Sequence, residues 1–360
     1  MHNLRRFLLL PLITIIILEI ISFGFFKLNL LEISHTPKIY LDKEFIPNDE
    51  WWTEEEIWGA WHKNNSATPQ KRSCYDVVYR SNEVGARDDS FADNDNNIVL
   101  LGDSFAEGYG VNIENTSQKY IEKFTNRNVL NFGVSHNFGP VQYSILYENL
   151  AKNFSHKTII IYLLPDNDFG ENDYTNWIGS KRYRPYYKFI NNNSYDTFFP
   201  DQSVKNYMSN TKKLKKILKD YFWTSNLFIN INYNYRIYRS SKKKLSNNFS
   251  GYFDSDIEQQ KAIIYFLNKI IDSVKSNVVL VSIPRPNDLS RLKNGSDLTT
   301  VYWNKYFINK DIYKTNFKFV DLINYLPENI DDIYLKCDGH WSPNGNLWAA
   351  KIISEFISKK

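Results

Sequence analysis

Cysteine is almost absent from this chain, since only Cys74 and Cys337 occur among its 360 residues. Two cysteines are too few for a disulfide framework or for a cysteine-based metal site, and we expect neither a metal nor another cofactor. A strong excess of one charge is also missing, because 44 basic and 40 acidic residues leave a net charge of +4. This balance gives no argument for nucleic-acid binding.

Long hydrophobic runs are scarce as well, and the mean hydropathy of -0.47 excludes a protein that crosses a membrane many times. The chain is nevertheless 42% hydrophobic and 23% charged, which makes disorder improbable and provides a core for one large domain or two small ones. Aromatic residues reach 16%. Such rings often line surfaces for sugars or lipids, although an aromatic core explains them equally well.

One long apolar segment does exist, at residues 7–26, with Glu19 as its single charge. A helix of this length spans a bilayer, and Arg5 and Arg6 before it predict a cytoplasmic N-terminus. We expect a cytoplasmic tail (1–6), an inner-membrane anchor (7–26) and an exported remainder. The alternative is a cleaved signal peptide, but no small-x-small cleavage site follows the segment. Glu19 would snorkel, stay protonated or face a partner helix.

An exported location would permit a disulfide bond between Cys74 and Cys337, and two unpaired thiols are the alternative. Both readings fit the sequence.

Residues 27–95 form the predicted juxtamembrane segment and carry few strand signals. The stretch 50–61 places Trp51, Trp58 and Trp61 near one face of a predicted helix. This helix would either lie at the membrane interface or pack as a flap on the domain.

From residue 97 onwards, short apolar runs alternate with amphipathic stretches, which is typical of βα units around a parallel sheet. The predicted strands are 98–101, 129–132, 158–164, 278–283 and 317–322, and the predicted helices are 140–153, 256–275 and 343–358. Ser255 with Glu258, and Ser342 before Pro343, mark helix starts. The stretch 170–253 does not follow this alternation of predicted strands and helices. We interpret it as an insertion with a basic helix at 211–223, acting as a lid, as a surface for anionic lipid or glycan, or as a solvated face.

The first predicted strand runs directly into Gly102-Asp103-Ser104. A serine at this point lies at the carboxyl edge of a parallel sheet, where α/β proteins place their sites. Its hydroxyl needs a base to become a nucleophile. His340 follows the last strand and can supply that base, and Asp338 is close enough in sequence to orient the imidazole.

Two other strand ends carry groups that can stabilise an oxyanion. Gly133 ends the second strand, and Asn167 follows the third. The amides of Ser104 and Gly133 and the side-chain amide of Asn167 are candidate donors. Each feature is ordinary alone, but all four at successive strand ends form a specific pattern.

With these motifs, the chain resembles the SGNH hydrolase superfamily, whose members are also called GDSL-type esterases. The matching residues are Ser104, Gly133, Asn167 before Asp168, and Asp338 with His340, and residues 79–87 resemble the segment before the first block in membrane-anchored bacterial members. The resemblance implies a three-layer α/β/α sandwich with a central parallel sheet of flavodoxin-like type, over residues 96–360. It also implies ester hydrolysis through an acyl-serine. Ser104 would be the nucleophile and Asp338 and His340 its partners, with Ser104, Gly133 and Asn167 forming the oxyanion hole.

Two positions depart from the family pattern. Pro165 replaces a glycine, and the spacing Asp-x-His, formed by Asp338 and His340, replaces the commoner Asp-x-x-His. The short Asp-x-His motif resembles the motif of proteins that acetylate exported polysaccharides. The sequence therefore leaves open an esterase that removes acyl groups from an envelope or exported glycan, an O-acyltransferase with a membrane partner that delivers the donor, a silent glycan-binding or assembly protein, and a lipase.

Overall fold

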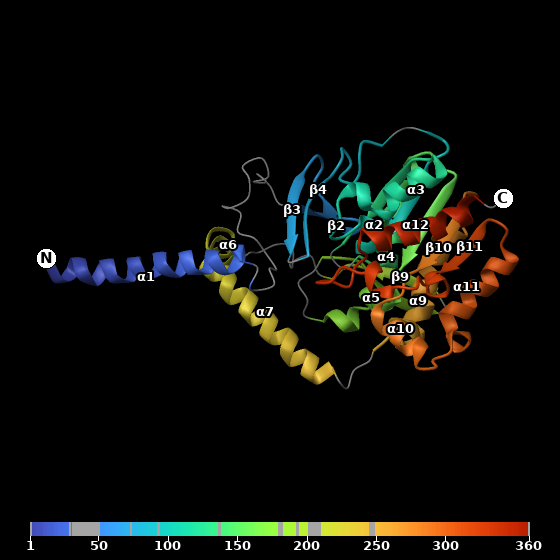
Figure 1. Cartoon of the computed structure of the whole chain (residues 1–360). Coiled ribbons are helices and arrows are strands. Elements are labelled where there is room, and N and C mark those ends of the chain that lie inside the picture. Colours follow the sequence, from blue (N-terminus) through green and yellow to red (C-terminus); the bar gives the residue numbers. More distant parts are fainter. Residues whose placement is uncertain are drawn as a thin grey trace. The chain divides into compact units, whose positions relative to one another are not determined.

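The computed structural model describes residues 2–28, 30, 51–72, 74–91, 94–135, 138–178, 183–191, 194–200, 210–244 and 249–358. Its contacts divide the chain into two compact units (Figure 1). The first contains residues 1–48, 68–77 and 206–247, and the second contains 49–67, 78–205 and 248–360.

The second unit is built on a five-stranded parallel sheet. Its strands are β5 (Ile98–Gly102), β6 (Val129–Gly133), β7 (Thr158–Leu163), β10 (Asn277–Ser282) and β11 (Phe317–Asp321). They lie in the order β11-β10-β7-β5-β6, and every paired neighbour is parallel. Counted along the chain this is the flavodoxin-like order 2-1-3-4-5, in which the direction of winding reverses between β5 and β7. All five predicted strands are confirmed.

Helices cover both faces of this sheet, as two separate apolar clusters show. One cluster joins the sheet to α4 (Pro140–Asn149), α9 (Ile257–Ile271) and α11 (Tyr302–Tyr313). The other joins it to α3 (Ser117–Thr125) and α12 (Pro343–Ser358). Successive β7 residues alternate between the clusters, with Ile161 in the first and Tyr162 in the second. The predicted three-layer α/β/α sandwich is therefore confirmed (Figure 1).

The predicted helix around residues 50–61 is wrong. This stretch is a hairpin of β1 (Trp52–Glu55) and β2 (Gly59–His62), paired antiparallel. Gly59 adopts a positive φ of 87°, which a helix cannot contain and which glycine tolerates best. Trp51, Trp58 and Trp61 are all buried, so this segment packs within its unit as the flap reading expected.

The remaining elements are short. They are the β3 (Ala67–Arg72) and β4 (Tyr75–Arg80) pair, the β8 (Tyr186–Asn191) and β9 (Ser194–Phe198) hairpin, and the helices α2 (Ser104–Glu107), α5 (Pro165–Glu171), α8 (Gly251–Asp254) and α10 (Pro286–Lys293). One predicted boundary moves: the side chain of Asp256, not Ser255, caps α9 by accepting from the amides of Glu258 and Gln259.

The described residues of the first unit include the helices α1 (His2–Lys27), α6 (Asn210–Tyr221) and α7 (Trp223–Lys244). By length and composition, Leu9–Lys27 is long and apolar enough to cross a membrane. The basic helix predicted at 211–223 corresponds to α6. Both cysteines are disulfide-bonded, so the alternative of two unpaired thiols is not what the structure shows.

Gly345 is a position where the fold admits no side chain. A Cβ built there would lie 2.1 Å from the carbonyl oxygen of Ile333, because the start of α12 packs tightly on the turn at Ile330–Ile333. We expect Gly345→Ala to lower the free energy of unfolding by about 1–3 kcal/mol, since a backbone carbonyl cannot move aside like a flexible side chain. Denaturant unfolding measures this. Asn344→Ala, at an exposed neighbouring position, is the matched control. Equal stability of the two variants would contradict the expectation.

Candidate active site

Ser104 lies at the point where the winding of the sheet reverses. It follows β5 and begins α2, and the side chain of Asp103 caps this turn by accepting from the Phe105 amide at 2.9 Å. The connections on the two sides of this point run in opposite directions, and they leave a crevice between them at the carboxyl edge of the sheet. Gly108 ends α2 with a positive φ of 81°. The Gly-Asp-Ser segment thus presents the serine where an α/β fold binds its ligands.

The structure brings Ser104, His340 and Asp338 together, although 236 residues separate the serine from the histidine. Ser104 Oγ lies 2.7 Å from His340 Nε2. On the other side of the ring, His340 Nδ1 is hydrogen-bonded to Asp338 Oδ1. The serine, imidazole and carboxylate form one continuous chain of hydrogen bonds, which is the arrangement that activates a serine nucleophile.

The short Asp-x-His spacing works because one carboxylate oxygen serves two groups. Asp338 Oδ1 accepts from the backbone amide of His340 at 3.2 Å as well as from the ring. The loop is closed behind it by the Tyr334 and Trp341 bridge and by the bond from the Leu335 amide to the His340 carbonyl at 2.8 Å. The carboxylate therefore holds both the loop and the imidazole.

Two aromatic rings pack on the His340 imidazole. The Tyr109 ring centroid lies 4.5 Å from it and the Phe105 centroid 5.0 Å, both at an angle of 35°. Phe105 is itself in edge contact with Trp341. These contacts restrict the ring plane in addition to the two hydrogen bonds.

The predicted oxyanion donors are only partly brought together. Asn167, near the start of α5, has its side-chain nitrogen 3.5 Å from Asp103 Oδ2, next to the serine. The Gly133 amide instead donates to Asn131 Oδ1 at 2.8 Å, so this geometry does not support its role as an oxyanion donor. Pro165 occupies the first turn of α5, where a missing N–H leaves no bond unmade.

A buried network supports the serine turn from below. Arg87 donates to the carbonyls of Glu107 and Val111 at 2.8 and 2.6 Å. The Glu107 carboxylate accepts from the Ser135 amide and lies 3.4 Å from His62 Nε2. The segment before the first motif therefore fixes the end of α2, the helix that begins with Ser104.

Arg285 is a site residue that the sequence analysis missed. It follows β10, so it lies at the same sheet edge as Ser104, and its Nε is 3.9 Å from Asp166 Oδ2. A Cβ on Gly339 would come 2.6 Å from Arg285 Nη2, which places the guanidinium against the loop between Asp338 and His340. Its place two residues after the predicted strand 278–283 was the signal that could have found it.

Two buried carboxyl groups lie beneath the site. Burial raises the pKa of Asp103 to about 6, against the lowering effect of its bond from Phe105 and of the neighbouring His340. Burial also raises the pKa of Asp168 well above its usual value, and the nearby Asp103 raises it further. Asp168 accepts from the Leu164 amide at 2.8 Å and from the Tyr143 hydroxyl at 3.1 Å.

The raised pKa of Asp103 predicts a pH dependence of stability. An aspartate in the unfolded chain ionises near pH 4. Between about pH 4 and pH 6 the folded state retains a proton that the unfolded state releases, so the free energy of unfolding falls as the pH rises through this window. Asp103→Asn keeps an acceptor for the Phe105 amide but cannot ionise, so we expect a smaller fall.

Thermal midpoints of both proteins between pH 4 and pH 7 measure the difference. Asp331→Asn, which changes an exposed carboxylate, is the control and should follow the unaltered chain. Parallel curves for Asp103→Asn and the unaltered chain would show that Asp103 does not titrate in this window.

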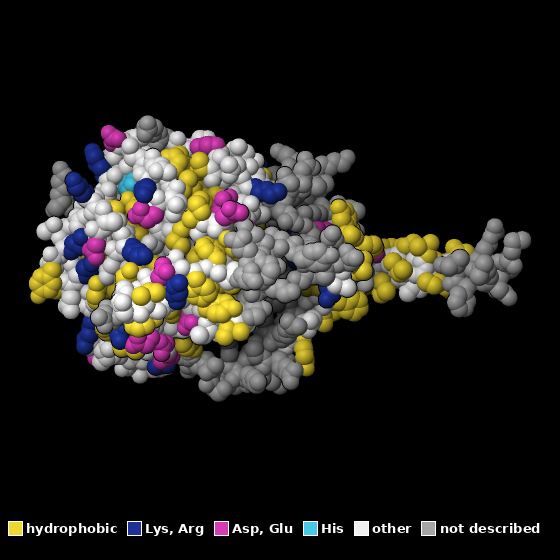
Figure 2. Space-filling model, turned by 180° about the vertical axis from the view of Figure 1, so that it is seen from behind, with side chains coloured by type: hydrophobic (Ala, Val, Ile, Leu, Met, Phe, Trp, Pro, Cys, Tyr) yellow, Lys and Arg dark blue, Asp and Glu magenta, His cyan; other side chains and the backbone are white. Residues whose placement is uncertain are grey.

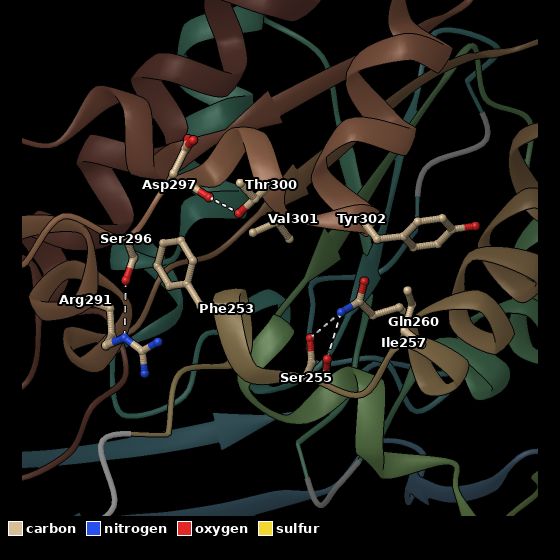
Figure 3. Close-up of a pocket in the computed structure, with 10 residues that line it drawn as sticks. All are labelled: Phe253, Ser255, Ile257, Gln260, Arg291, Ser296, Asp297, Thr300, Val301 and Tyr302. Carbon is tan, nitrogen blue, oxygen red and sulfur yellow. Dashed lines mark hydrogen bonds between the residues drawn. The ribbon is translucent and has the colours of Figure 1, made fainter.

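A separate pocket lies away from these residues. It has a volume of about 440 Å³ and is lined by the start of α9, by α10 and by the turn that follows α10 (Figure 3). Its polar groups mostly bond to one another: Gln260 donates to the carbonyl and hydroxyl of Ser255, and Thr300 donates to the Asp297 carbonyl. No triad residue lines it.

Comparison with known proteins gives structural neighbours only. No family model and no curated protein matches the chain. A member of the lipolytic G-D-S-L family from Veillonella parvula is 12% identical, with a TM-score of 0.38 over 73% of this chain and 99% of that one. A lipase from a goat rumen metagenome is 12% identical, with a TM-score of 0.40 over 72% and 96%. A carbohydrate esterase is 13% identical, with a TM-score of 0.36 over 75% and 67%. Similarity at this level does not assign a family.

Proposed function

We propose that this chain is a serine esterase of the SGNH type that acts on ester-linked acyl groups, most simply acetyl groups, of a cell-envelope or exported glycan. The observation that carries the proposal is the hydrogen-bonded chain from Ser104 Oγ through His340 to Asp338. These three groups are sufficient for acyl transfer to and from a serine, and no cofactor is needed.

The mechanism follows from the geometry. His340 Nε2 takes the proton of the Ser104 hydroxyl as Oγ attacks the ester carbonyl, and the charge on Asp338 stabilises the imidazolium that forms. The amide of Ser104 and the side chain of Asn167 would stabilise the negative oxygen. The imidazolium then protonates the leaving alcohol, which leaves an acyl-serine. Water attacks this intermediate in a hydrolase, with His340 as base again.

The second candidate function is O-acyl transfer. It uses the same acyl-serine but delivers the acyl group to a sugar hydroxyl, and the Asp-x-His spelling favours it. The silent glycan-binding protein and the lipase stay as further alternatives. The assembled triad argues against the non-catalytic alternative, because a protein that only binds a glycan has no need for a serine 2.7 Å from an oriented imidazole.

We further propose that residues 7–26 anchor the chain in the inner membrane, with the N-terminus in the cytoplasm and the catalytic domain outside. Supporting this, the apolar side chains of α1 are largely exposed, with only 11% of the candidate span buried. Figure 2 shows hydrophobic side chains along this helix on the face in view.

The test supplies the purified chain with an acyl donor, with and without an acetylatable oligosaccharide. Release of free acid in both cases supports an esterase, and acyl groups on the sugar support a transferase. Peptide mapping after a fluorophosphonate probe should place the label on Ser104. No turnover together with no label on Ser104 would reject both catalytic proposals.

A further inference from the structure

Glu19 of α1 makes an unusual contact for a charge inside an apolar helix. Its carboxylate accepts from the backbone amides of Trp223 and Thr224, the latter at 3.0 Å, and from the Thr224 hydroxyl at 2.6 Å. These groups form the start of α7, where the first N–H groups of a helix have no partner within it. Glu19 thus caps a second helix from within the predicted membrane span.

Apolar contacts surround this polar one. The Trp223 ring packs against Phe26 and Phe23, at centroid distances of 4.9 and 5.6 Å, and Leu227 packs against the same cluster. Ser22 is buried and donates to the Thr224 hydroxyl at 3.3 Å. The start of α7 is therefore docked on the last two turns of α1, within one compact unit.

The two faces of α7 differ in a way that suits an apolar environment. Asn226, Asn230 and Asn234 recur every four residues, and each donates its side-chain amide to the carbonyl one turn earlier, at 2.8 to 2.9 Å. Phe228, Ile231 and Tyr235 lie on the opposite face, exposed. The side-chain NH₂ groups of these asparagines donate within the helix while the apolar side chains point outward, which is the reverse of a water-soluble surface helix.

The sequence around this docking point is also segregated by charge. Residues 221–235 contain no charged side chain. On one side α6 carries lysines at 212, 213, 215, 216 and 219 and one acidic residue, the buried Asp220, and on the other α7 carries arginine at 236 and 239 and lysine at 242–244. Leu214, Ile217 and Leu218 add exposed apolar side chains next to the uncharged stretch, and Tyr221 and Phe222 at its start are exposed as well.

We infer that the end of α6 and the first part of α7 together insert an uncharged tip, residues 221–235, into the outer leaflet beside α1, while Lys215 and Lys219 of α6 contact anionic lipid headgroups. The inference rests on the proposed membrane anchor, because the tip contacts α1 through Trp223 and Thr224. Glu19 lies eight residues before Lys27, so at 1.5 Å per residue the capped end of α7 reaches about 12 Å below the end of α1.

The contact between α1 and α7 also bears on whether α1 is retained or cleaved. Cleavage after the apolar segment would remove the cap from α7 and expose Trp223, so the contact favours a retained anchor over a cleaved signal. A glycan or a soluble protein is a poorer partner for the tip, because the apolar residues of the tip adjoin α1, the helix proposed to lie in lipid.

The experiment uses the full-length chain in phosphatidylcholine vesicles, with and without phosphatidylglycerol. The variants Phe228→Cys, Leu12→Cys and Tyr313→Cys each carry an environment-sensitive fluorophore on the new thiol, and the native cysteines do not react because they are disulfide-bonded. Tyr313, an exposed aromatic residue of α11, is the matched control for Phe228. Nitroxide lipids quench labels in the bilayer, and iodide quenches labels in water. Far-UV circular dichroism confirms folding of each variant.

We expect nitroxide quenching at 228 to be several-fold stronger than at 313 and similar to that at 12, with iodide giving the opposite order. Phosphatidylglycerol should increase nitroxide quenching at 228. A label in lipid at residue 12 but in water at residue 228 would overturn insertion of the tip while leaving the proposed anchor intact. Labels in water at both positions would overturn the anchor itself. Insertion that is insensitive to phosphatidylglycerol would remove the headgroup contact from the proposal.

Discussion

Ser104→Ala is expected to abolish fluorophosphonate labelling and to lower kcat on a short-chain nitrophenyl ester by about 10⁴-fold or more. The reason is that the hydroxyl 2.7 Å from His340 Nε2 is the only group of the triad that can carry the acyl intermediate. Without it, bound water must attack the ester directly, helped only by the remaining donors.

The control for this variant is Ser290→Ala, which removes an exposed hydroxyl on α10. It should retain full labelling and turnover. Labelling that persists in Ser104→Ala would remove this serine from the mechanism. Full function in vivo without the hydroxyl would instead favour the silent glycan-binding alternative.

Asp338→Asn is expected to lower kcat by about 10⁴-fold with little change in KM. The amide cannot supply the negative charge that stabilises the imidazolium, and its NH₂ group can favour the wrong tautomer of His340. Its oxygen can still accept from the His340 backbone amide, which lies 3.2 Å from Asp338 Oδ1, so the loop should keep its conformation. The loss should therefore appear in turnover and not in folding.

Steady-state kinetics together with thermal unfolding measure both parts of this prediction. Asp331→Asn, which alters an exposed aspartate nearby in the chain, should leave kcat unchanged. Activity of Asp338→Asn within about ten-fold of the unaltered chain would show that the Asp-x-His spacing does not produce a working orienter.

The central sheet was predictable because its strands are buried on both faces. A strand such as Thr158–Leu163 has no solvent face, so it reads as an unbroken apolar run that no polar residue obscures. The flanking hairpin at residues 52–62 was not predictable in the same way. Its tryptophans fit a helical spacing, and only the positive φ of Gly59, which depends on the packed structure, decides against a helix.

The site was predictable where its residues follow strands directly, as Ser104 and Asn167 do. Arg285 and Tyr109 were missed because their importance comes from contacts across the fold, with Gly339 and with the His340 ring. The bond that occupies the Gly133 amide was also beyond a sequence pattern, since Asn131 is two residues away and could have pointed elsewhere.

The cap on α7 has a consequence for how the chain is made. Glu19 and Trp223 are 204 residues apart, so α1 leaves the ribosome long before its partner helix exists. At typical rates of synthesis the delay is about 10–40 s. During that time the Glu19 carboxylate has none of its three later donors, which are the backbone amides of Trp223 and Thr224 and the Thr224 hydroxyl. The contact between α1 and α7 can therefore form only after β5, β6 and β7 of the sheet have been made, and before β10 and β11.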